Sequence, residues 1–550
     1  MPISPARACR IVLFASAALF AFPALAADPV PADRDDAAVE PQREGGEDIV
    51  VTARRRVERS QDVPIAINAF GAAQIESTRT YNLRDLQQLT PSLVVTNTNP
   101  RNTSINIRGL GNNVAVYNDG LEPAVGVYVD GVYLARPGQT VFDLADLERI
   151  EVLRGPQGTL FGKNTSAGAV VVTTRMPTFD PEAGGDVSLG NVGFRQLHAY
   201  VSGPITDSLA ARLFVSKTDR DGFTRNRFDG RLGQDFHDLN VRGQLLYRPT
   251  DTLTLRVIGD WGRQHAFTAG TILLGAIRSY DNGANFANNY YDRAARLGYT
   301  PVPADPAFRI TDVNANPRYA MNQHGINVTA DLDLGAATLT SVTAYRAWNW
   351  YPHNDGDGTS IDAGADFHQS NEQKQVSQEL RIASNGDRPV DYVAGLYYLY
   401  QSIRAEAVNL YGSRAADWFL PPTTNAAVGA AALNDYGVVS QSRPVTDSYA
   451  AFAQTTWHIV PGVDLTTGLR YTYETKSGYF DQVAAGRSLA GLTPAQQAAA
   501  QAIRSRYGVA NRYEAETRAG RLSGQATLSW KVADPVLGYV TYARGNKFGG

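Results

Sequence analysis

Residues 239–262 decide the fold, and they read LNVRGQLLYRPTDTLTLRVIGDWG. Before the turn PTDT, apolar and polar side chains alternate, with the apolar ones at Leu239, Val241, Leu245 and Tyr247. After the turn the alternation resumes at Leu253, Leu255 and Val257. A strand whose side chains alternate in this way has one apolar face and one polar face. The stretch therefore predicts two such strands joined by a tight turn.

The same alternation recurs through the second half of the chain, as in INVTADLDL at 326–334, VDLTTGLRYTYE at 463–474 and LSGQATLSWKV at 522–532. About thirteen strands are expected from Gly184 to Arg544, with boundaries uncertain by roughly two to four residues. Every second link between them is long, at 263–325, 350–373, 402–446 and 477–519, whereas the others are tight turns.

Alternating strands also occur in soluble β-sandwiches, which are the competing interpretation. Short turns on one side, long loops on the other and aromatic residues near strand ends are instead typical of outer-membrane barrels. The sequence therefore favours an all-β transmembrane barrel of antiparallel strands. The aromatic residues expected at the membrane interfaces are Tyr247, Trp261, Trp348, Trp350, Tyr397, Tyr398, Trp457, Tyr473 and Trp530.

The first 26 residues have the three parts of a cleaved signal peptide: basic residues, an apolar run at 11–25, and small residues before the expected cut. The only cysteine, Cys9, lies in this segment, so the exported chain would have neither a disulfide nor a cysteine nucleophile. The formal net charge of −3 provides no basic field for nucleic acid. No later stretch has the roughly eighteen apolar residues of a membrane helix, so a membrane would have to be crossed by a barrel.

Residues 60–178 differ from the barrel region in pattern. NLRDLQQL at 82–89 has helical spacing of its leucines, and the glycine-bounded runs 126–133 and 169–174 predict strands, which together suit a compact α+β domain. GTLFGKN at 158–164 is one residue shorter than a phosphate-binding loop and has Asn164 where Ser or Thr should stand. Because a strand follows it, we do not interpret it as a nucleotide site.

The order of DIVVTARR, INIRGLG, VYVDGVYL, LERIEVLRGPQGTLFGKNTSAGAVVVTTR and then alternating strands resembles the TonB-dependent receptors of Gram-negative outer membranes. The resemblance spans essentially the whole exported chain. It implies a 22-stranded barrel, with about 13 strands present in residues 179–550, and an N-terminal plug domain at 60–178 inside the lumen. The odd strand count and the absence of a terminal aromatic strand give the expectation that the sequence is C-terminally incomplete.

The resemblance also places a TonB box in the periplasmic leader at 27–59. The box residues are Asp48, Ile49, Val50, Val51 and Thr52. β-branched residues favour extended backbone, and an unpaired strand can add to the sheet edge of a partner protein. The box is thus expected to be extended with no partner in its own chain; the alternative is an edge strand of the plug.

Plug arginines in this family commonly pair with glutamates of the barrel. The matching residues are Arg108 and Arg154 in the plug, with Glu379 as the expected wall partner. The alternative for Glu379 is an ordinary lumen-facing carboxylate beside Arg381.

The function implied is energy-coupled import of a scarce ligand, first of all a ferric siderophore, with remodelling of the plug. The expected partners are TonB with its inner-membrane energising complex, outer-membrane lipid and a small-molecule metal chelate, with neither nucleic acid nor cofactor nor enzymatic activity. The alternatives are a passive porin-type channel and uptake of a non-iron ligand such as an oligosaccharide or cobalamin.

Ligand-binding residues stay unassigned, although ANNYYDR at 287–293 has suitable amide and aromatic groups. HNDGDGTSID at 353–362 resembles a calcium loop only loosely, because Thr359 and Ser360 break the spacing. The seven histidines form no zinc motif such as HExxH, and no metal site is predicted.

Overall fold

The fold comes from a computed structural model, which describes residues 50–549 except positions 57, 81, 98, 112–118, 141–144, 387 and 535. The predicted signal peptide, most of the leader, and the box residues Asp48 and Ile49 lie outside the described residues. Among the described residues, no helix combines the length and the apolar run that a membrane-crossing helix requires.

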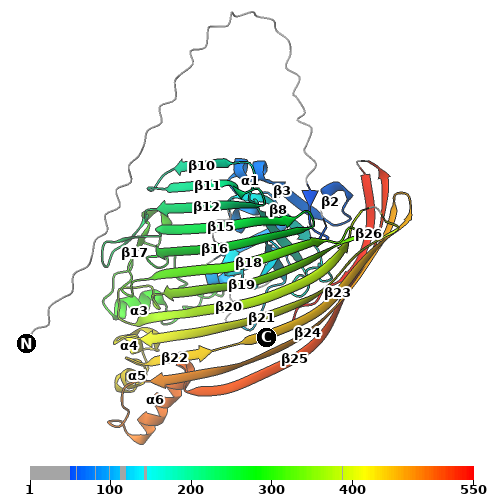
Figure 1. The fold of residues 1–550 in the computed structure, drawn as a ribbon. Helices are drawn as coiled ribbons and strands as arrows, with labels where there is room; N and C mark the ends of the chain where they lie inside the picture. Colours follow the sequence, from blue (N-terminus) through cyan, green and yellow to red (C-terminus); the bar gives the residue numbers. More distant parts are fainter. Residues whose placement is uncertain are drawn as a thin grey trace, which may run out of the picture. The chain divides into compact units, whose positions relative to one another are not determined.

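One large antiparallel sheet dominates residues 182–544, with each strand beside its sequence neighbour (Figure 1). The sheet has 14 strand segments, of which β22 and β23 lie end to end between β21 and β24, so 13 strand positions result and confirm the predicted number. In the described residues β10 and β26 each pair on one side only. The segments are β10 (Glu182–Leu189), β11 (Arg195–Thr206), β12 (Leu209–Arg220), β15 (Phe236–Thr250), β16 (Leu253–Phe267), β18 (Arg318–Asp333), β19 (Ala337–His353), β20 (Gly364–Ser384), β21 (Val390–Tyr411), β22 (Gly437–Ser442), β23 (Val445–Val460), β24 (Val463–Ala485), β25 (Asn511–Ala533) and β26 (Val536–Arg544).

Side chains of this wall are polar on the concave face and apolar on the convex face, which reverses the usual soluble arrangement. On β15, Leu245 and Tyr247 are 42% and 41% exposed, whereas Asp238 and Gln244 are each 3% exposed. Gln244 donates a hydrogen bond from Nε2 to the carbonyl of Arg175, which lies just after the last plug strand. The apolar set read from the sequence therefore faces outward, as a lipid-facing wall requires.

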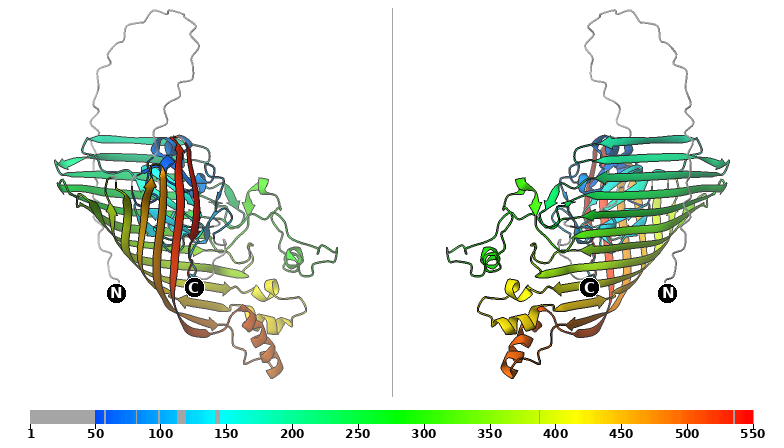
Figure 2. Two further views of the ribbon diagram at one scale, coloured as in Figure 1. Left: turned by 90° about the vertical axis from the view of Figure 1, so that its right-hand side faces the viewer. Right: turned by 90° about the vertical axis from the view of Figure 1, so that its left-hand side faces the viewer.

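The long links carry their own small elements and gather at one end of the wall, opposite the tight turns (Figures 1 and 2). Helix α6 begins with a capping box between Thr493 and Gln496, with proline in its first turn. The elements of these loops are β13 (Thr224–Asn226), β14 (Leu232–Gly233), α3 (Tyr290–Arg296), η4 (Pro306–Phe308), β17 (Ile310–Thr311), α4 (Ala415–Phe419), α5 (Ala426–Leu433) and α6 (Pro494–Tyr507).

The N-terminal domain lies within the concave face of the wall (Figure 2). Its central sheet has the order β3-β8-β9-β6-β7, in which only β6 and β9 run parallel, and β4 and β5 form a separate hairpin. Its elements are β1 (Val50–Val51), β2 (Glu58–Arg59), η1 (Ser60–Asp62), β3 (Ile67–Gly71), α1 (Ala72–Thr78), α2 (Leu83–Leu86), β4 (Leu93–Asn97), η2 (Pro100–Asn102), β5 (Thr103–Ile107), β6 (Val125–Val129), β7 (Val132–Leu134), η3 (Pro137–Thr140), β8 (Leu147–Arg154) and β9 (Gly168–Thr174).

Two sequence predictions for this domain need correction. The helix expected over 82–89 shrinks to the single turn α2, whose first amides are capped by the Asn82 side chain. The strand expected over 126–133 is a hairpin, because Asp130 and Gly131 adopt φ of 48° and 81° and turn the chain between β6 and β7. Asp-Gly is a favoured pair for such a two-residue turn.

Aromatic residues divide between the two faces of the wall. Tyr247, Trp261, Trp457, Tyr473 and Trp530 are 39–45% exposed, as interface residues should be. Trp348 and Trp350 are buried beneath the plug and loops, and Tyr397 packs with a plug cluster, so the interface prediction was wrong for these three. Strand alternation places them inward, and position near a strand end could not reveal that.

Candidate functional site: the junction of leader, plug and wall

The first described residues form a short hairpin against the plug. Val50 pairs with Arg59, and Val51 pairs with Glu58, in an antiparallel ladder of two residue pairs. The Val51 side chain is fully buried in a cluster with Val63 of the plug and Val393 of the wall. The expectation that this segment has no partner in its own chain is therefore wrong for Val50 and Val51.

Thr52 is held by a buried carboxylate of the central plug sheet. Glu151 on β8 is fully buried, and its two oxygens accept the Thr52 amide at 2.9 and 3.1 Å. The Thr52 hydroxyl also donates to Glu151 at 3.0 Å, and Arg149 Nε donates to the same carboxylate at 3.0 Å. A buried carboxylate needs such donors, because burying it without them is costly. Glu151 thus fixes the leader to the plug.

Two arginines of the triplet 54–56, Arg54 and Arg56, each make an ion pair. Arg54 pairs with Glu58 at 2.5 Å, which closes the leader hairpin. Arg56 pairs with Asp391 on β21 at 2.6 Å, with side chains 24% and 16% exposed. The second contact joins the leader directly to the barrel wall.

Arg55 makes the more buried wall contact. Its Nη2 lies 3.3 Å from Glu379 Oε2 on β20, and Arg381 Nη1 donates to the other oxygen at 2.7 Å. The Arg55 guanidinium also lies over the ring of Phe161, 4.8 Å from the centroid, and 5.7 Å from that of Tyr128. Cation–π contact adds to the ion pair where water is excluded.

The predicted lock residues are therefore only partly brought together. Glu379 does lie in the lumen against an arginine, but its partners are Arg55 and Arg381, and neither Arg108 nor Arg154 contacts it. Arg108 has an exposed side chain at a left-handed turn after β5. Arg154 has a buried Nε with no hydrogen-bond partner among the described residues. The plug fold directs both guanidinium groups elsewhere, which a motif match cannot show.

We call this junction the leader latch. In the sequence, the arginine triplet 54–56 beside the predicted box is the feature that could have indicated it. The leader latch consists of Val51, Thr52, Arg55 and Arg56, held by Glu151, Glu379 and Asp391.

A second ionic contact ties the plug to the wall farther from the tight turns. Lys163 Nζ lies 2.9 Å from Glu122 of the plug and 2.5 Å from Glu474, the middle residue of β24. Lys476 adds a bond to the Gly120 carbonyl at 2.9 Å. All four charged residues are at most 7% exposed. We call Lys163, Glu122, Glu474 and Lys476 the plug anchor.

The anchor also settles the role of the GTLFGKN stretch. Its lysine is occupied by two carboxylates, and the chain continues into β9. Asn164 donates to the other oxygen of Glu122 at 2.5 Å. Burial alone raises the pKa of Glu122, but the Lys163 and Lys476 ammonium groups and the Asn164 amide outweigh it and lower the pKa below its ordinary value of 4.5.

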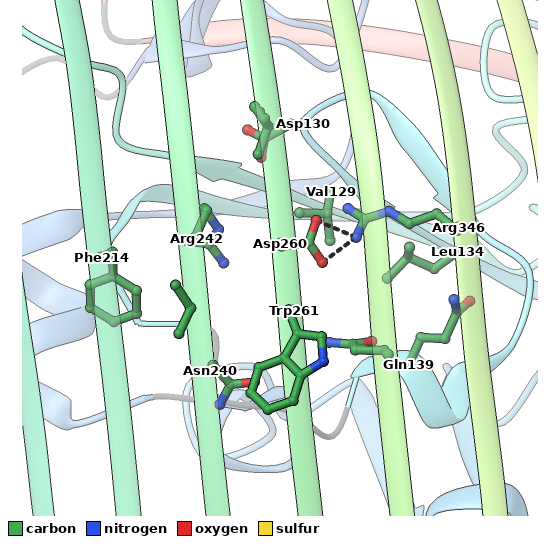
Figure 3. Close-up of a pocket in the computed structure, with 13 residues that line it drawn as sticks. Val129, Asp130, Leu134, Gln139, Phe214, Asn240, Arg242, Asp260, Trp261 and Arg346 are labelled. Atoms are coloured by element: carbon green, nitrogen blue, oxygen red, sulfur yellow. Dashed lines mark hydrogen bonds and ion pairs between the residues drawn. The ribbon is translucent and has the colours of Figure 1, made fainter. Parts of the chain in front are cut away.

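Elsewhere the plug meets the wall across a polar seam (Figure 3). Arg346 Nη1 on β19 lies 2.5 Å from both oxygens of Asp260 on β16, beside Arg242 and the turn residue Asp130. A cavity of about 50 Å³ between these groups leaves space for ordered water. A seam that contains charged groups and has room for water can exchange partners more easily than a packed apolar core.

At the loop end, the plug, the wall and the loops line a much larger, open cavity of about 1000 Å³. Its size matches the upper range of small-molecule sites. The groups around it offer amides, rings and a carboxylate, which suits a polar ligand of substantial size. Among the residues lining it are Asn97 and Asn99 of the plug, and Gln264, Tyr319, Trp350 and Asp355 of the wall and loops.

The carboxylates of the 353–362 loop accept hydrogen bonds from backbone amides of this loop and of neighbouring segments. Asp355 accepts the amides of Asp357 and Gly358 with one oxygen and those of Asn314 and Ala315 with the other. Asp357 accepts the amides of Thr359 and Gly364 in the same way. Burial, and then the charge of Asp355, raises the pKa of Asp357 to about 7. These oxygens are used as backbone caps and are not arranged as a calcium cage.

Comparison with known proteins agrees with this architecture. Residues 59–169 match the TonB-dependent receptor plug domain, and residues 268–550 match the TonB-dependent receptor-like β-barrel, which alone covers more than half of the chain. The chain belongs to the TonB-dependent receptor family. The predicted plug-and-barrel fold is thereby confirmed.

Several relatives of this receptor have names that mention pesticin, iron regulation or a siderophore. The pesticin receptor of Yersinia pestis is 29% identical over 438 residues, which are 78% of this chain and 56% of the relative. The ferrioxamine B receptor of Salmonella typhimurium is 41% identical over 95 residues, 16% of this chain and 13% of the relative. The chain thus spans about half the length of the first of these.

Solved structures share the fold of the receptor. The ferric yersiniabactin uptake receptor of Yersinia pestis superposes with a TM-score of 0.67 at 19% identity, covering 88% of this chain and 65% of the other. The ferric-catecholate import receptor of Escherichia coli K12 gives 0.61 at 14% identity, covering 89% and 71%. At these identities the likeness concerns the fold.

Proposed function

We propose that the receptor imports a metal chelate, first of all a ferric siderophore, across the outer membrane of a Gram-negative bacterium. Energy would arrive through TonB, bound at the box residues 48–52. The names of the relatives support the ligand class, and the cavity of about 1000 Å³ at the loop end supplies the space.

The leader latch is the observation that carries this proposal. Residues 51–56 are bonded to the plug through Glu151 and to the wall through Glu379 and Asp391. Tension applied to the chain before Val51 therefore acts first on the contacts that hold plug and wall together. A passive pore needs no such connection between a leader and its plug.

The ladder of the leader hairpin is short enough to be exchanged. In the part of the leader that the structure describes, two residue pairs join β1 to β2, and Val50 is 39% exposed. A partner strand that adds to the box would gain main-chain hydrogen bonds in place of this ladder. Once Val50 and Val51 leave, Thr52 loses its support and Glu151 is left with Arg149 alone.

Release of the arginines would follow. Withdrawal of Arg55 and Arg56 leaves Glu379 with Arg381, and Asp391 with His458, as their remaining basic partners. The polar seam then permits the plug to shift, and ligand held at the loop end gains a path along the wall. Each step uses groups of this chain and force from outside it.

The test is uptake by cells that produce Val51→Pro, with Val50→Ala as the matched control. Proline removes an amide donor and prevents strand addition, whereas alanine keeps the backbone intact. With iron-loaded yersiniabactin and ferrioxamine B as probes, we expect surface binding to be unchanged and uptake to be lost in Val51→Pro only. Uptake by Val51→Pro at the wild-type rate would contradict the box assignment, and uptake that survives collapse of the proton gradient would favour a porin.

A further inference from the structure

We propose that His353, Asp366 and His368 form a binding site for a divalent transition-metal ion, best matched by Zn²⁺, on the outward face of the wall at the root of the 354–363 loop. The site is separate from the loop-end cavity and does not depend on transport. It takes the ion itself, without a chelator.

The three side chains already lie at ligand distances from one another. His353 Nδ1 is 3.1 Å from Asp366 Oδ2, and His368 Nδ1 is 2.8 Å from Asp366 Oδ1. One nitrogen or oxygen from each residue falls within 4.8 Å of the others. Ligands at roughly 2.0–2.1 Å from a tetrahedral zinc are about 3.3 Å apart, so small side-chain shifts would admit an ion.

Strand register brings these residues together. Trp350 on β19 pairs with Asn371 on β20, and continuing this register places His353 opposite His368. Trp350 lines the loop-end cavity and Asn371 donates to the plug residue Asp119, so both face inward. The alternate positions 353, 366 and 368 therefore face outward.

The donor set suits a borderline metal better than calcium or magnesium. Two imidazole nitrogens and one carboxylate oxygen are common zinc ligands, and three protein ligands leave the fourth position open to water. Calcium prefers six to eight oxygens, and the nearby Asp355 and Asp357 are occupied by backbone amides. The His353 side chain is 41% exposed, whereas those of Asp366 and His368 are 16% and 13% exposed. An ion can therefore reach a site whose other two ligands are held in place.

A bound ion would join β19 to β20 beyond the last pair of their ladder. The loop between these strands lines the cavity through Asn354, Asp355 and Gly358. Metal binding is therefore expected to restrain this loop. The competing explanation is that Asp366 only accepts hydrogen bonds from the two imidazoles.

Titration of the purified chain with zinc chloride separates the two explanations. The chain is folded in detergent micelles, carries no polyhistidine tag, and is studied by calorimetry at neutral pH. We expect one zinc site per chain, absent in the double variant His353→Ala and His368→Ala. Asp366→Asn should bind at least about tenfold more weakly, since even the outer partners of metal ligands contribute that much.

His198→Ala is the matched control, because His198 is a buried histidine whose Nδ1 lies 3.1 Å from the carboxylate of Asp186. It should bind zinc as the wild type does. The variants His353→Asn and His368→Gln keep polar side chains, so loss of zinc in them cannot be assigned to an unfolded wall. Equal stoichiometry and affinity in the wild type and the double variant would overturn the proposal. So would failure of the wild type to bind zinc at micromolar concentration.

Discussion

The plug of this receptor meets the wall through two ionic contacts, which differ in their burial and in the chain segment that carries them. The leader latch lies near the tight turn between β20 and β21, with Glu379 five residues from the end of β20 and Asp391 in the second position of β21. The plug anchor lies at the middle of β24 and is buried throughout. The latch belongs to a segment with a two-pair ladder, whereas the anchor belongs to the loop between plug strands β8 and β9.

This difference shows how one domain can be both firmly seated and removable by force. Charges buried in pairs are costly to separate, because each one left alone has lost its solvation. In the latch such charges sit directly on the chain that a partner would pull. In the anchor they sit where tension on the leader arrives only after the latch has opened. The following changes test this order of strength.

The largest effect is expected for Lys163→Met. It leaves Glu122 and Glu474 buried with Lys476 as their remaining cation, at 3.9 and 3.5 Å. Removal of one partner of a buried pair costs about 3–5 kcal/mol. Urea unfolding of the plug, followed by protease cleavage within residues 60–178, should move to lower urea. The control Arg487→Met removes an exposed pair with Asp435 and should change little. An equal shift in both variants would mean that the plug anchor does not stabilise the plug.

Glu379→Gln should weaken the latch without unseating the plug. It removes the charge that Arg55 and Arg381 share, and unpaired buried groups cost about 1–3 kcal/mol or more. Cleavage of the leader hairpin at 50–62 by a protease should accelerate about tenfold or more. Glu406→Gln, on the neighbouring strand β21, is the control. If the plug were cleaved as fast as the hairpin, the two contacts would not be separable.

A smaller effect is expected for Thr52→Val, which has nearly the same shape. The change removes the hydroxyl bond to Glu151 but keeps the amide bonds, so a loss of about 1 kcal/mol, or roughly fivefold faster hairpin cleavage, is expected. Thr78→Val removes a hydroxyl bond at the surface of α1 and provides the baseline. Cleavage no faster in Thr52→Val than in Thr78→Val would show that Glu151 does not hold the leader by this group.

Acidification from pH 7 to pH 5 should leave the contribution of Glu122 to the plug anchor unchanged. The pKa of Glu122 is lowered below 4.5, so its contribution to stability is fully present above pH 4.5 and is lost only as the pH falls through the lowered value. Fluorescence of the buried Trp348, which packs near the plug, can follow plug seating across this range. Loosening between pH 7 and pH 5 that disappears in Glu122→Gln would contradict the assignment.

Much of the fold could be predicted because the alternation of apolar and polar side chains is visible in the sequence. Leu245 and Tyr247 face outward as read, since a period of two fixes the face of each side chain once the strand is recognised. The turn at Asp130 and Gly131 could also be predicted from the Asp-Gly pair, although the apolar run around it favours a single strand. Trp348 and Tyr397 show the limit of this prediction, because the position of an aromatic residue near a strand end does not tell whether its ring faces lipid or the plug.

The candidate site was less predictable. Glu379 was recognised as a wall carboxylate that meets an arginine, but its partner Arg55 lies 324 residues away in the leader and not in the plug motifs. The sequence predicts no ionic role for Lys163, because its partner Glu474 is 311 residues distant in the chain. His353 and His368 form no sequence motif, since register across two strands brings them together.

By itself, the sequence determined which residues form strands, which side of each strand is apolar, and the order of plug and wall. These features depend on residues that are close together along the chain. Only the tertiary structure decided which charges meet. Ion pairs between plug and wall depend on how a folded domain is rotated within a curved sheet, and no local pattern encodes that rotation.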